Sequence, residues 1–389
     1  MSNGIYFLLV AQFLSAFADN ALLFTVIAMV MQGGHTGGWY VPALQSAFLV
    51  AFVLLAPWVG HFADRRPKPR VLIIGNALKA FGTSLILSGI EPLLAYAIVG
   101  AGAAVYGPAK YGILPELVGH QSLVKANGLI EGSTIVAIVL GTVVGGQLAD
   151  ASVKTALLLV LLMFIGSAAV TLLLPRISAR GVETGPALAG FIGKLRGFFT
   201  TARARFSMLG ASLFWATAAT LRVLLVAWAP LVLLMKNAGE IAELTLSLAM
   251  GIVAGAALVP RLIPIECLRR ARLAGYVMGA LIILLAGIES LWPARFILFA
   301  IGVAGGMFVV PINAALQEIG HRSIGSGGAV AIQNFFENVA MLLAVGLYTF
   351  ASSQGAHPVP TIGVLGTSAM VATLVVSWHL PQDPEVVES

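Results

Sequence analysis

A carboxylate lies in the middle of the first long apolar run of this sequence. The stretch VAQFLSAFADNALLFTVIAMV carries Asp19 and Asn20 between apolar residues on both sides. A charge at the centre of a membrane helix costs roughly 2.5–3.5 kcal/mol on insertion scales, so it persists where it has a partner or a task. The function of this chain therefore depends on what Asp19 does.

Asp19 is one of six charges in the interior of the predicted apolar spans, away from the span ends, and three of the six are negative and three positive. Each belongs to a polar stripe at helical spacing, which aims it at one face of its helix instead of at lipid all round. A polar-lined space between two halves of the chain is therefore expected. The other five charges are Lys79, Lys110, Glu131, Arg222 and Glu337. The stripes are Gln12, Ser15 and Asp19; Asn76, Lys79 and Thr83; Asn127, Glu131 and Thr134; Ser212, Trp215 and Arg222; and Gln333 with Glu337.

Two structural roles compete with a functional one for these charges. Residues of opposite sign can neutralise one another as contacts between helices. Lys110 lies in the cytoplasmic third of its span, where a long side chain can extend to the membrane interface. Asp19 and Arg222 both lie near the midpoint of the first span of their halves, too deep for that, and are the strongest functional candidates.

The composition identifies the elements that must position these residues. The chain is 59% hydrophobic and only 10% charged, whereas a soluble domain carries about 25% charged residues. It is therefore a polytopic membrane protein. With six His and a single Cys267, neither a disulfide framework nor a Cys/His metal cluster is expected, and no cofactor is predicted.

Apolar runs of about 20 residues, each long enough to cross a bilayer, predict twelve transmembrane helices in two groups of six. The first group covers residues 5–31, 41–63, 71–90, 93–114, 126–149 and 154–174. The second covers 206–234, 242–263, 272–290, 294–316, 326–350 and 359–380.

Lys and Arg set the expected orientation, because they are enriched in cytoplasmic loops. Loops on one side hold only Lys154, Lys236 and Arg295, and the remaining basic loop residues gather on the other side. Both termini are therefore predicted to be cytoplasmic. The predicted domains are an N-terminal six-helix half (1–174), a cytoplasmic linker (175–205) and a C-terminal six-helix half (206–389).

The two halves also resemble each other. VYGPAKYGILPELVGHQS (105–122) resembles FVVPINAALQEIGHRS (308–323), and Asn127 to Glu131 matches Gln333 to Glu337. These matches fall at equivalent spans of the two groups, so a parallel internal repeat is expected. The fold class predicted is an all-α membrane protein with two pseudo-symmetric halves.

The loop GHFADRRPKPR after the second span resembles the signature of the major facilitator superfamily. Pro67 replaces the usual Gly of that signature. The resemblance implies the major facilitator fold and a cytoplasmic latch, an ion-pair and helix-dipole contact that breaks when the transporter switches state. The expected latch residues are Gly60, Asp64, Arg65, Arg66, Lys68 and Arg70, with Ala63 completing the motif.

A closer resemblance covers nearly the whole chain. The segments AQFLSAFADNALLF, GPAKYGILPELV, LVKANGLIEGSTI, SLFWATAATLR, FVVPINAALQE and AIQNFFENVAML look like the bacterial inner-membrane lysophospholipid transporter family. The resemblance implies a flippase that moves lysophospholipids, chiefly lysophosphatidylethanolamine, from the outer to the inner leaflet of that membrane. Its implied partners are membrane lipids and an acyltransferase/acyl-carrier-protein synthetase that restores the diacyl lipid in phospholipid remodelling. A monomer without nucleic-acid binding is expected.

Such a substrate carries a phosphate, an ammonium and one acyl chain. The resemblance thus implies that Arg222 holds the phosphate, with Lys110 or Lys79 as a second positive charge. Asp19 and Asn20 would take the ammonium or hold Arg222 in place, and Asp19 would balance Arg222. The expected substrate-binding set is Asp19, Asn20, Lys79, Lys110, Arg222, Glu131, Gln333 and Glu337.

Three other functions compete with lysolipid transport. A proton-coupled exporter of drugs or small amphiphiles would use Asp19, Glu131 or Glu337 as the titrating group. An enzyme is not expected, because none of the six His is followed five residues later by Asp and there is no Gly-x-Ser-x-Gly elbow. A structural partner protein without transport is the last alternative.

Overall fold

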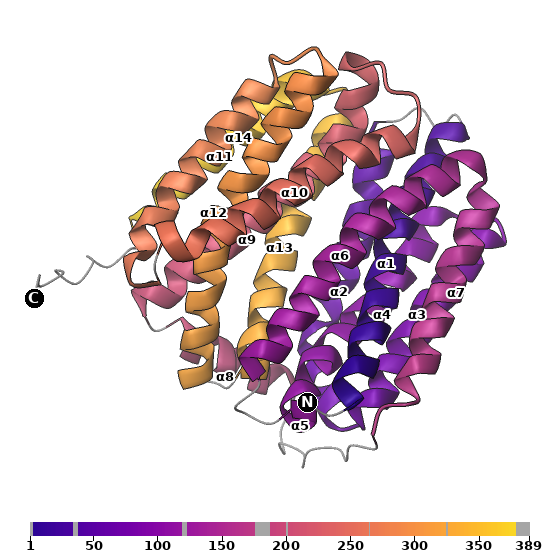
Figure 1. The fold of residues 1–389 in the computed structure, drawn as a ribbon, viewed down its shortest axis with the longest axis vertical. Coiled ribbons are helices and arrows are strands. Elements are labelled where there is room, and N and C mark those ends of the chain that lie inside the picture. The colour runs from indigo at the N-terminus through magenta and orange to yellow at the C-terminus, as the bar shows by residue number, and fades with distance from the viewer. Residues whose placement is uncertain are drawn as a thin grey trace, which may run out of the picture. The chain divides into compact units, whose positions relative to one another are not determined.

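The computed structural model describes residues 3–33, 38–118, 123–175, 187–199, 201–263, 265–323 and 326–378. Every element within these ranges is helical, as the sequence predicted (Figure 1). The helices are α1 (Asn3–Gln32), α2 (Tyr40–Asp64), α3 (Lys68–Leu87), α4 (Pro92–Gly112), α5 (Leu114–Val118), α6 (Leu123–Ala151), α7 (Val153–Thr171), α8 (Ala187–Phe198), α9 (Ala202–Val232), α10 (Ala238–Leu262), η2 (Ile265–Arg270), α11 (Ala271–Leu285), α12 (Leu291–Ser323), α13 (Ser326–Ser353) and α14 (Pro358–Ser377).

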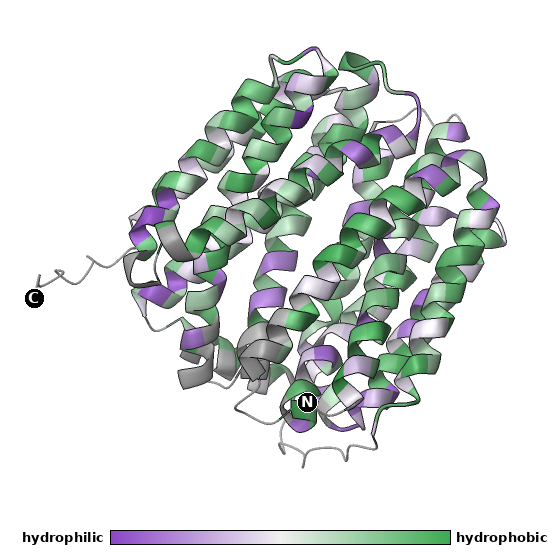
Figure 2. Ribbon diagram, in the orientation of Figure 1, coloured by the Kyte–Doolittle hydropathy of each residue, from purple (hydrophilic) through white to green (hydrophobic). Residues whose placement is uncertain are grey.

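Eleven helices of the described chain are long and apolar enough to cross a membrane. Figure 2 shows hydrophobic residues along most of the length of these helices. The span predicted at 272–290 is the exception, because α11 has only 15 residues and rises about 22 Å, less than the roughly 30 Å hydrocarbon core. The 3-10 helix η2 directly precedes it in the chain.

The chain divides into two compact units that do not follow its sequence halves strictly. The first unit contains Met1–Phe191, Met235–Leu246 and Tyr348–Ser353. The second contains Ile192–Leu234, Ser247–Leu347 and Gln354–Ser389. The beginning of α10 and the end of α13 therefore belong with the first unit, while the rest of both helices belongs with the second.

Asp150 accounts for part of this division. Its Oδ1 accepts a hydrogen bond from the backbone N–H of Ala238 at 3.0 Å, and its Oδ2 accepts one from Gly239 at 2.7 Å. The first N–H groups of a helix have no partner within the helix and carry partial positive charge. The Asp150 carboxylate at the end of α6 thus accepts hydrogen bonds from the first backbone N–H groups of α10. Both partners belong to the first unit.

Glycines bring α6 against the backbone of α1 in the first unit. A Cβ on Gly145 would lie 2.7 Å from the carbonyl oxygen of Ala21, and one on Gly141 would meet the carbonyl of Phe17. These contacts leave no space for a side chain, so glycines four residues apart allow the close packing of the two helices. Asp19 lies between the two contact points on α1.

Candidate functional site

Polar side chains of α1 and α3 face the interior of the first unit. On α1, Gln12, Ser15 and Asp19 follow at spacings of three and four residues, which place them on one face of the helix. On α3, Asn76 is 0% and Lys79 1% exposed. Both helices pack on α7. The polar stripes predicted for these two spans are thus directed at protein and not at lipid.

Asp19 and Lys79 form an ion pair. Lys79 Nζ lies 2.7 Å from Asp19 Oδ2 and donates a second hydrogen bond to Ser15 Oγ at 2.9 Å. Because a charge taken out of water is stable mainly when it is paired, each of the two residues explains the presence of the other. Within the first unit the cation partner of Asp19 is therefore Lys79. The expected balance between Asp19 and Arg222, which belongs to the second unit, stays a prediction.

A chain of hydrogen bonds continues from this pair. Ser15 Oγ donates to Asn76 Oδ1 at 2.9 Å, and Asn76 Nδ2 donates to Ser167 Oγ at 2.8 Å. Ser167 Oγ donates in turn to the backbone carbonyl of Ala11 at 2.6 Å. Each hydroxyl both accepts and donates, so the network connects α1, α3 and α7 and returns to α1. Such fully connected networks fix side-chain positions in low-dielectric surroundings.

Two aromatic rings complete the surroundings of Lys79. Its Nζ lies 4.8 Å from the ring centroid of Tyr106 on α4 and 5.4 Å from that of Phe164 on α7. Rings at these distances attract a cation through their quadrupole. Sequence reasoning missed Tyr106, Phe164 and Ser167, because an aromatic residue or a lone Ser in an apolar span gives no signal of its own.

One oxygen of Asp19 lacks a hydrogen-bond donor in the described part of the chain. Oδ1 is buried and has no hydrogen-bond partner among the described residues. The Asp19 side chain is 24% exposed, against 2% for Lys79. Because a buried acceptor without a partner is costly, Oδ1 is the atom of this cluster that gains most from a donor.

The other predicted residues of the first unit make further contacts of their own. Asn20 Nδ2 donates to the carbonyl of Ala16, one turn back on its own helix. Lys110 is 9% exposed and its Nζ lies 4.2 Å from the ring centroid of Tyr111. The side chain of Glu131 lies outside the described residues.

The predicted latch is described only in part. Lys68 is 3% exposed and donates to the carbonyl of Ala63 at 2.9 Å, near the C-terminus of α2 where a cation is favourable. Arg66 lies over the ring of Phe62 at 4.0 Å. Asp64 is the last residue of α2, but its side chain lies outside the described residues, so the latch stays a prediction. The motif also contains Gly60, Arg65 and Arg70, of which Arg65 and Arg70 are exposed.

The second unit has a buried polar cluster of its own. Gln333 Nε2 on α13 donates to Asn313 Oδ1 on α12 at 3.0 Å and to Glu337 Oε1 at 2.7 Å. Glu337 is 7% exposed. Arg222 is half-buried on α9 of the same unit. The structure thus brings Gln333 and Glu337 together, as it brings Asp19 and Lys79 together in the first unit.

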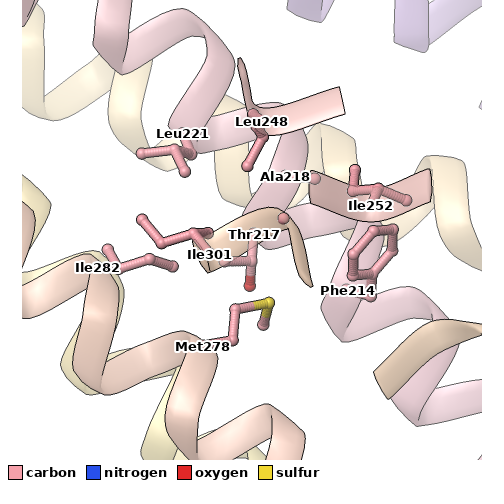
Figure 3. Close-up of a pocket in the computed structure, with 10 residues that line it drawn as sticks. Phe214, Thr217, Ala218, Leu221, Leu248, Ile252, Met278, Ile282 and Ile301 are labelled. Atoms are coloured by element: carbon pink, nitrogen blue, oxygen red, sulfur yellow. The ribbon is translucent and has the colours of Figure 1, made fainter. Parts of the chain in front are cut away.

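A small apolar cavity lies among α9, α10, α11 and α12 of the second unit (Figure 3). Phe214, Leu221, Ile252 and Met278 line it, and Thr217 brings a hydroxyl to it. Its volume is about 20 Å³, whereas one water needs roughly 10–15 Å³ by this measure. The cavity is therefore too small to enclose an acyl chain.

Comparison with known sequences decides the family. A profile of the Major Facilitator Superfamily matches residues 8–345. This chain belongs to the major facilitator superfamily. Two major facilitator relatives are both called lysophospholipid transporter LplT. The protein from Photorhabdus laumondii is 42% identical over 382 residues, covering 97% of this chain and 96% of the relative. The protein from Klebsiella pneumoniae is 43% identical over 381 residues, with the same coverage.

Solved structures show the same major facilitator fold. The nucleoside transporter NupG matches 97% of this chain and 100% of its own with a TM-score of 0.75 at 13% identity. The human organic anion transporter MFSD10 matches 95% of this chain and 98% of its own with a TM-score of 0.65 at 16% identity. The resemblance that the loop at Gly60–Arg70 indicated is thus confirmed at the level of the fold.

Proposed function

We propose that this chain carries lysophospholipids across the bacterial inner membrane, from the outer to the inner leaflet, where they are re-acylated. The observation that carries the proposal is the likeness, at 42–43% identity over 97% of the chain, to relatives named lysophospholipid transporters. Lysophosphatidylethanolamine is the expected main substrate. Both termini are expected in the cytoplasm.

The polar clusters offer chemistry that suits a zwitterionic head group. Asp19 Oδ1 is a buried acceptor that has no partner among the described residues, and an ammonium supplies three N–H donors. Arg222 supplies a planar guanidinium, which binds two phosphate oxygens at once. Lys110 offers a second positive charge. Asn20, Glu131, Gln333 and Glu337 are the remaining members of the proposed polar lining.

The acyl chain is proposed to stay in the hydrocarbon between helices while the head group crosses. A chain of some fifteen methylenes gains little by moving from lipid into an apolar cavity, since both are apolar. The small volume of the cavity on α9–α12 agrees with this arrangement. Chain length should therefore affect transport much less than the head group does.

Flipping by purified protein in liposomes tests the function. We expect lysophosphatidylethanolamine to reach the opposite leaflet faster than in protein-free liposomes, lysolipids of different chain length to compete similarly, and diacyl phosphatidylethanolamine to compete poorly. No acceleration over protein-free liposomes would refute the proposal.

Uptake by spheroplasts, repeated after an uncoupler, separates this function from a proton-coupled exporter. An exporter would show steep dependence on chain length, indifference to the head group and loss of transport without the proton gradient.

A further inference from the structure

Lys79 is surrounded in a way that leaves no place for a substrate atom. Its ammonium carries three donors. One meets Asp19 Oδ2 at 2.7 Å and another meets Ser15 Oγ at 2.9 Å. The rings of Tyr106 and Phe164 lie 4.8 and 5.4 Å away. A phosphate oxygen would have to displace one of these groups before it could contact Lys79.

The two members of the ion pair differ in solvent exposure. The side chain of Lys79 is 2% exposed, and that of Asp19 is 24% exposed. Lys79 holds Oδ2, and Oδ1 has no partner in the described part of the chain. The carboxylate thus has one oxygen committed to Lys79 and one buried oxygen that still lacks a donor among the described residues.

Resting on the function proposed above, we infer that Lys79 is a positioning residue, which fixes Asp19 so that Oδ1 receives the ammonium of the lysolipid head group. Lys79 itself touches no part of the substrate. Ser15 holds Lys79, Asn76 holds Ser15, and Ser167 holds Asn76. This role differs from the second phosphate-binding charge that the sequence suggested for Lys79.

The ion pair also sets how strongly the ammonium binds. A lone carboxylate in low-dielectric surroundings attracts an ammonium strongly, whereas one already paired with Lys79 attracts it less. A carrier has to release its substrate, so binding at a transport site must be favourable enough to enter and weak enough to leave. Lys79 therefore keeps the attraction of Asp19 for the head group moderate.

Kinetics with two lysolipids test this role. Lysophosphatidylethanolamine carries an ammonium, and lysophosphatidylglycerol keeps the phosphate and acyl chain without it. In Lys79→Met we expect the KM for the first lipid to fall about fivefold together with its maximal rate, because the unpaired carboxylate holds the ammonium longer. Both constants for the second lipid should stay within about twofold. Lys79→Arg should restore the wild-type pattern in part.

A second set of variants covers the case in which Lys79→Met does not fold. Asn76→Leu breaks the hydrogen-bond chain one step from Lys79 and leaves both charges in place, so it should change the ratio of the two KM values in the same direction by a smaller factor. The double variant Asp19→Asn with Lys79→Met removes both charges and should abolish the preference for the ammonium lipid.

An equal rise in the KM for both lipids in folded Lys79→Met would overturn the positioning role. It would indicate that Lys79 contacts the phosphate, which both lipids carry. An unchanged ratio in Lys79→Met and Asn76→Leu would overturn it as well. Failure of the wild-type protein to flip either lipid would instead refute the proposed function, and with it this role.

Discussion

Replacing Gly145 with Ala tests whether the approach of α6 to α1 holds Asp19 in place. The added Cβ would lie 2.7 Å from the carbonyl oxygen and 2.9 Å from the carbonyl carbon of Ala21. Ordinary carbon contacts are about 3.5–4.0 Å, so the two helices would have to separate by about 1 Å. Both partners are backbone atoms of α1, which no side-chain rotation can move away.

Gly132 on the same helix is the matched control. A Cβ there meets no atom within 4 Å. Overpacking costs about 1–3 kcal/mol, while replacing a helical Gly with Ala gains up to about 1 kcal/mol of helix propensity. Gly145→Ala should therefore lose about 1–2 kcal/mol, and Gly132→Ala should gain up to about 1 kcal/mol.

Thermal unfolding in detergent measures the difference. The two variants differ by the overpacking cost of about 1–3 kcal/mol. With about 2–4 °C per kcal/mol for domains of 150–250 residues, Gly145→Ala should unfold about 2–12 °C below Gly132→Ala. Lysolipid flipping should also fall in Gly145→Ala, because Asp19 lies one half-turn from Ala21. Equal unfolding temperatures for the two variants would show that the reasoning from the α1–α6 contact is wrong.

Variants at three further sites, with one control, test other parts of the molecule. Asp150→Ala removes both acceptors from the first turn of α10 and should destabilise the protein by about 1–2 kcal/mol, as loss of a helix cap does; an unchanged unfolding temperature would argue against the contact. Arg222→Ala should abolish flipping while membrane insertion stays normal, and Arg222→Lys should restore it only in part. The control is Arg203→Ala on the same helix as Arg222, where Arg203 forms a partly exposed ion pair with Glu318 of α12; this variant should leave flipping unchanged. Asp64→Asn should shift the population towards the inward-open state, which cysteine accessibility from each side would detect and which identical labelling patterns would contradict.

The buried polar residues could be found from the sequence, but the partner of Asp19 could not. Helical spacing places Asp19 on a polar stripe and Lys79 on another. Identifying Lys79 as a partner needs the packing of α1 and α3 on α7, which no spacing within one helix contains. Matching residues by depth in equivalent spans predicts Arg222 as a partner, and that pairing stays a prediction.

The length of α11 is a second feature that the sequence pattern predicts only in part. The apolar run at 272–290 correctly predicts a helix in an apolar environment. It does not predict that regular α-helix covers only Ala271–Leu285, because the residues before it take a 3-10 conformation and Gly287 follows its end. The apolar composition of the segment indicates an apolar environment, but the backbone geometry determines where the regular α-helix begins and ends.

The cap that Asp150 provides has a consequence for the order of synthesis. Asp150 and its partner Ala238 are 88 residues apart, so the carboxylate leaves the ribosome well before α10 exists. At about 5–20 residues per second, it waits roughly 4–18 s for those backbone N–H groups. Water or lipid head groups must solvate Asp150 during that interval. The end of α6 therefore has to reach the membrane surface during biogenesis. A variant in which this end is buried before α10 is synthesised would assemble more slowly, although the stability of the folded protein would be unchanged.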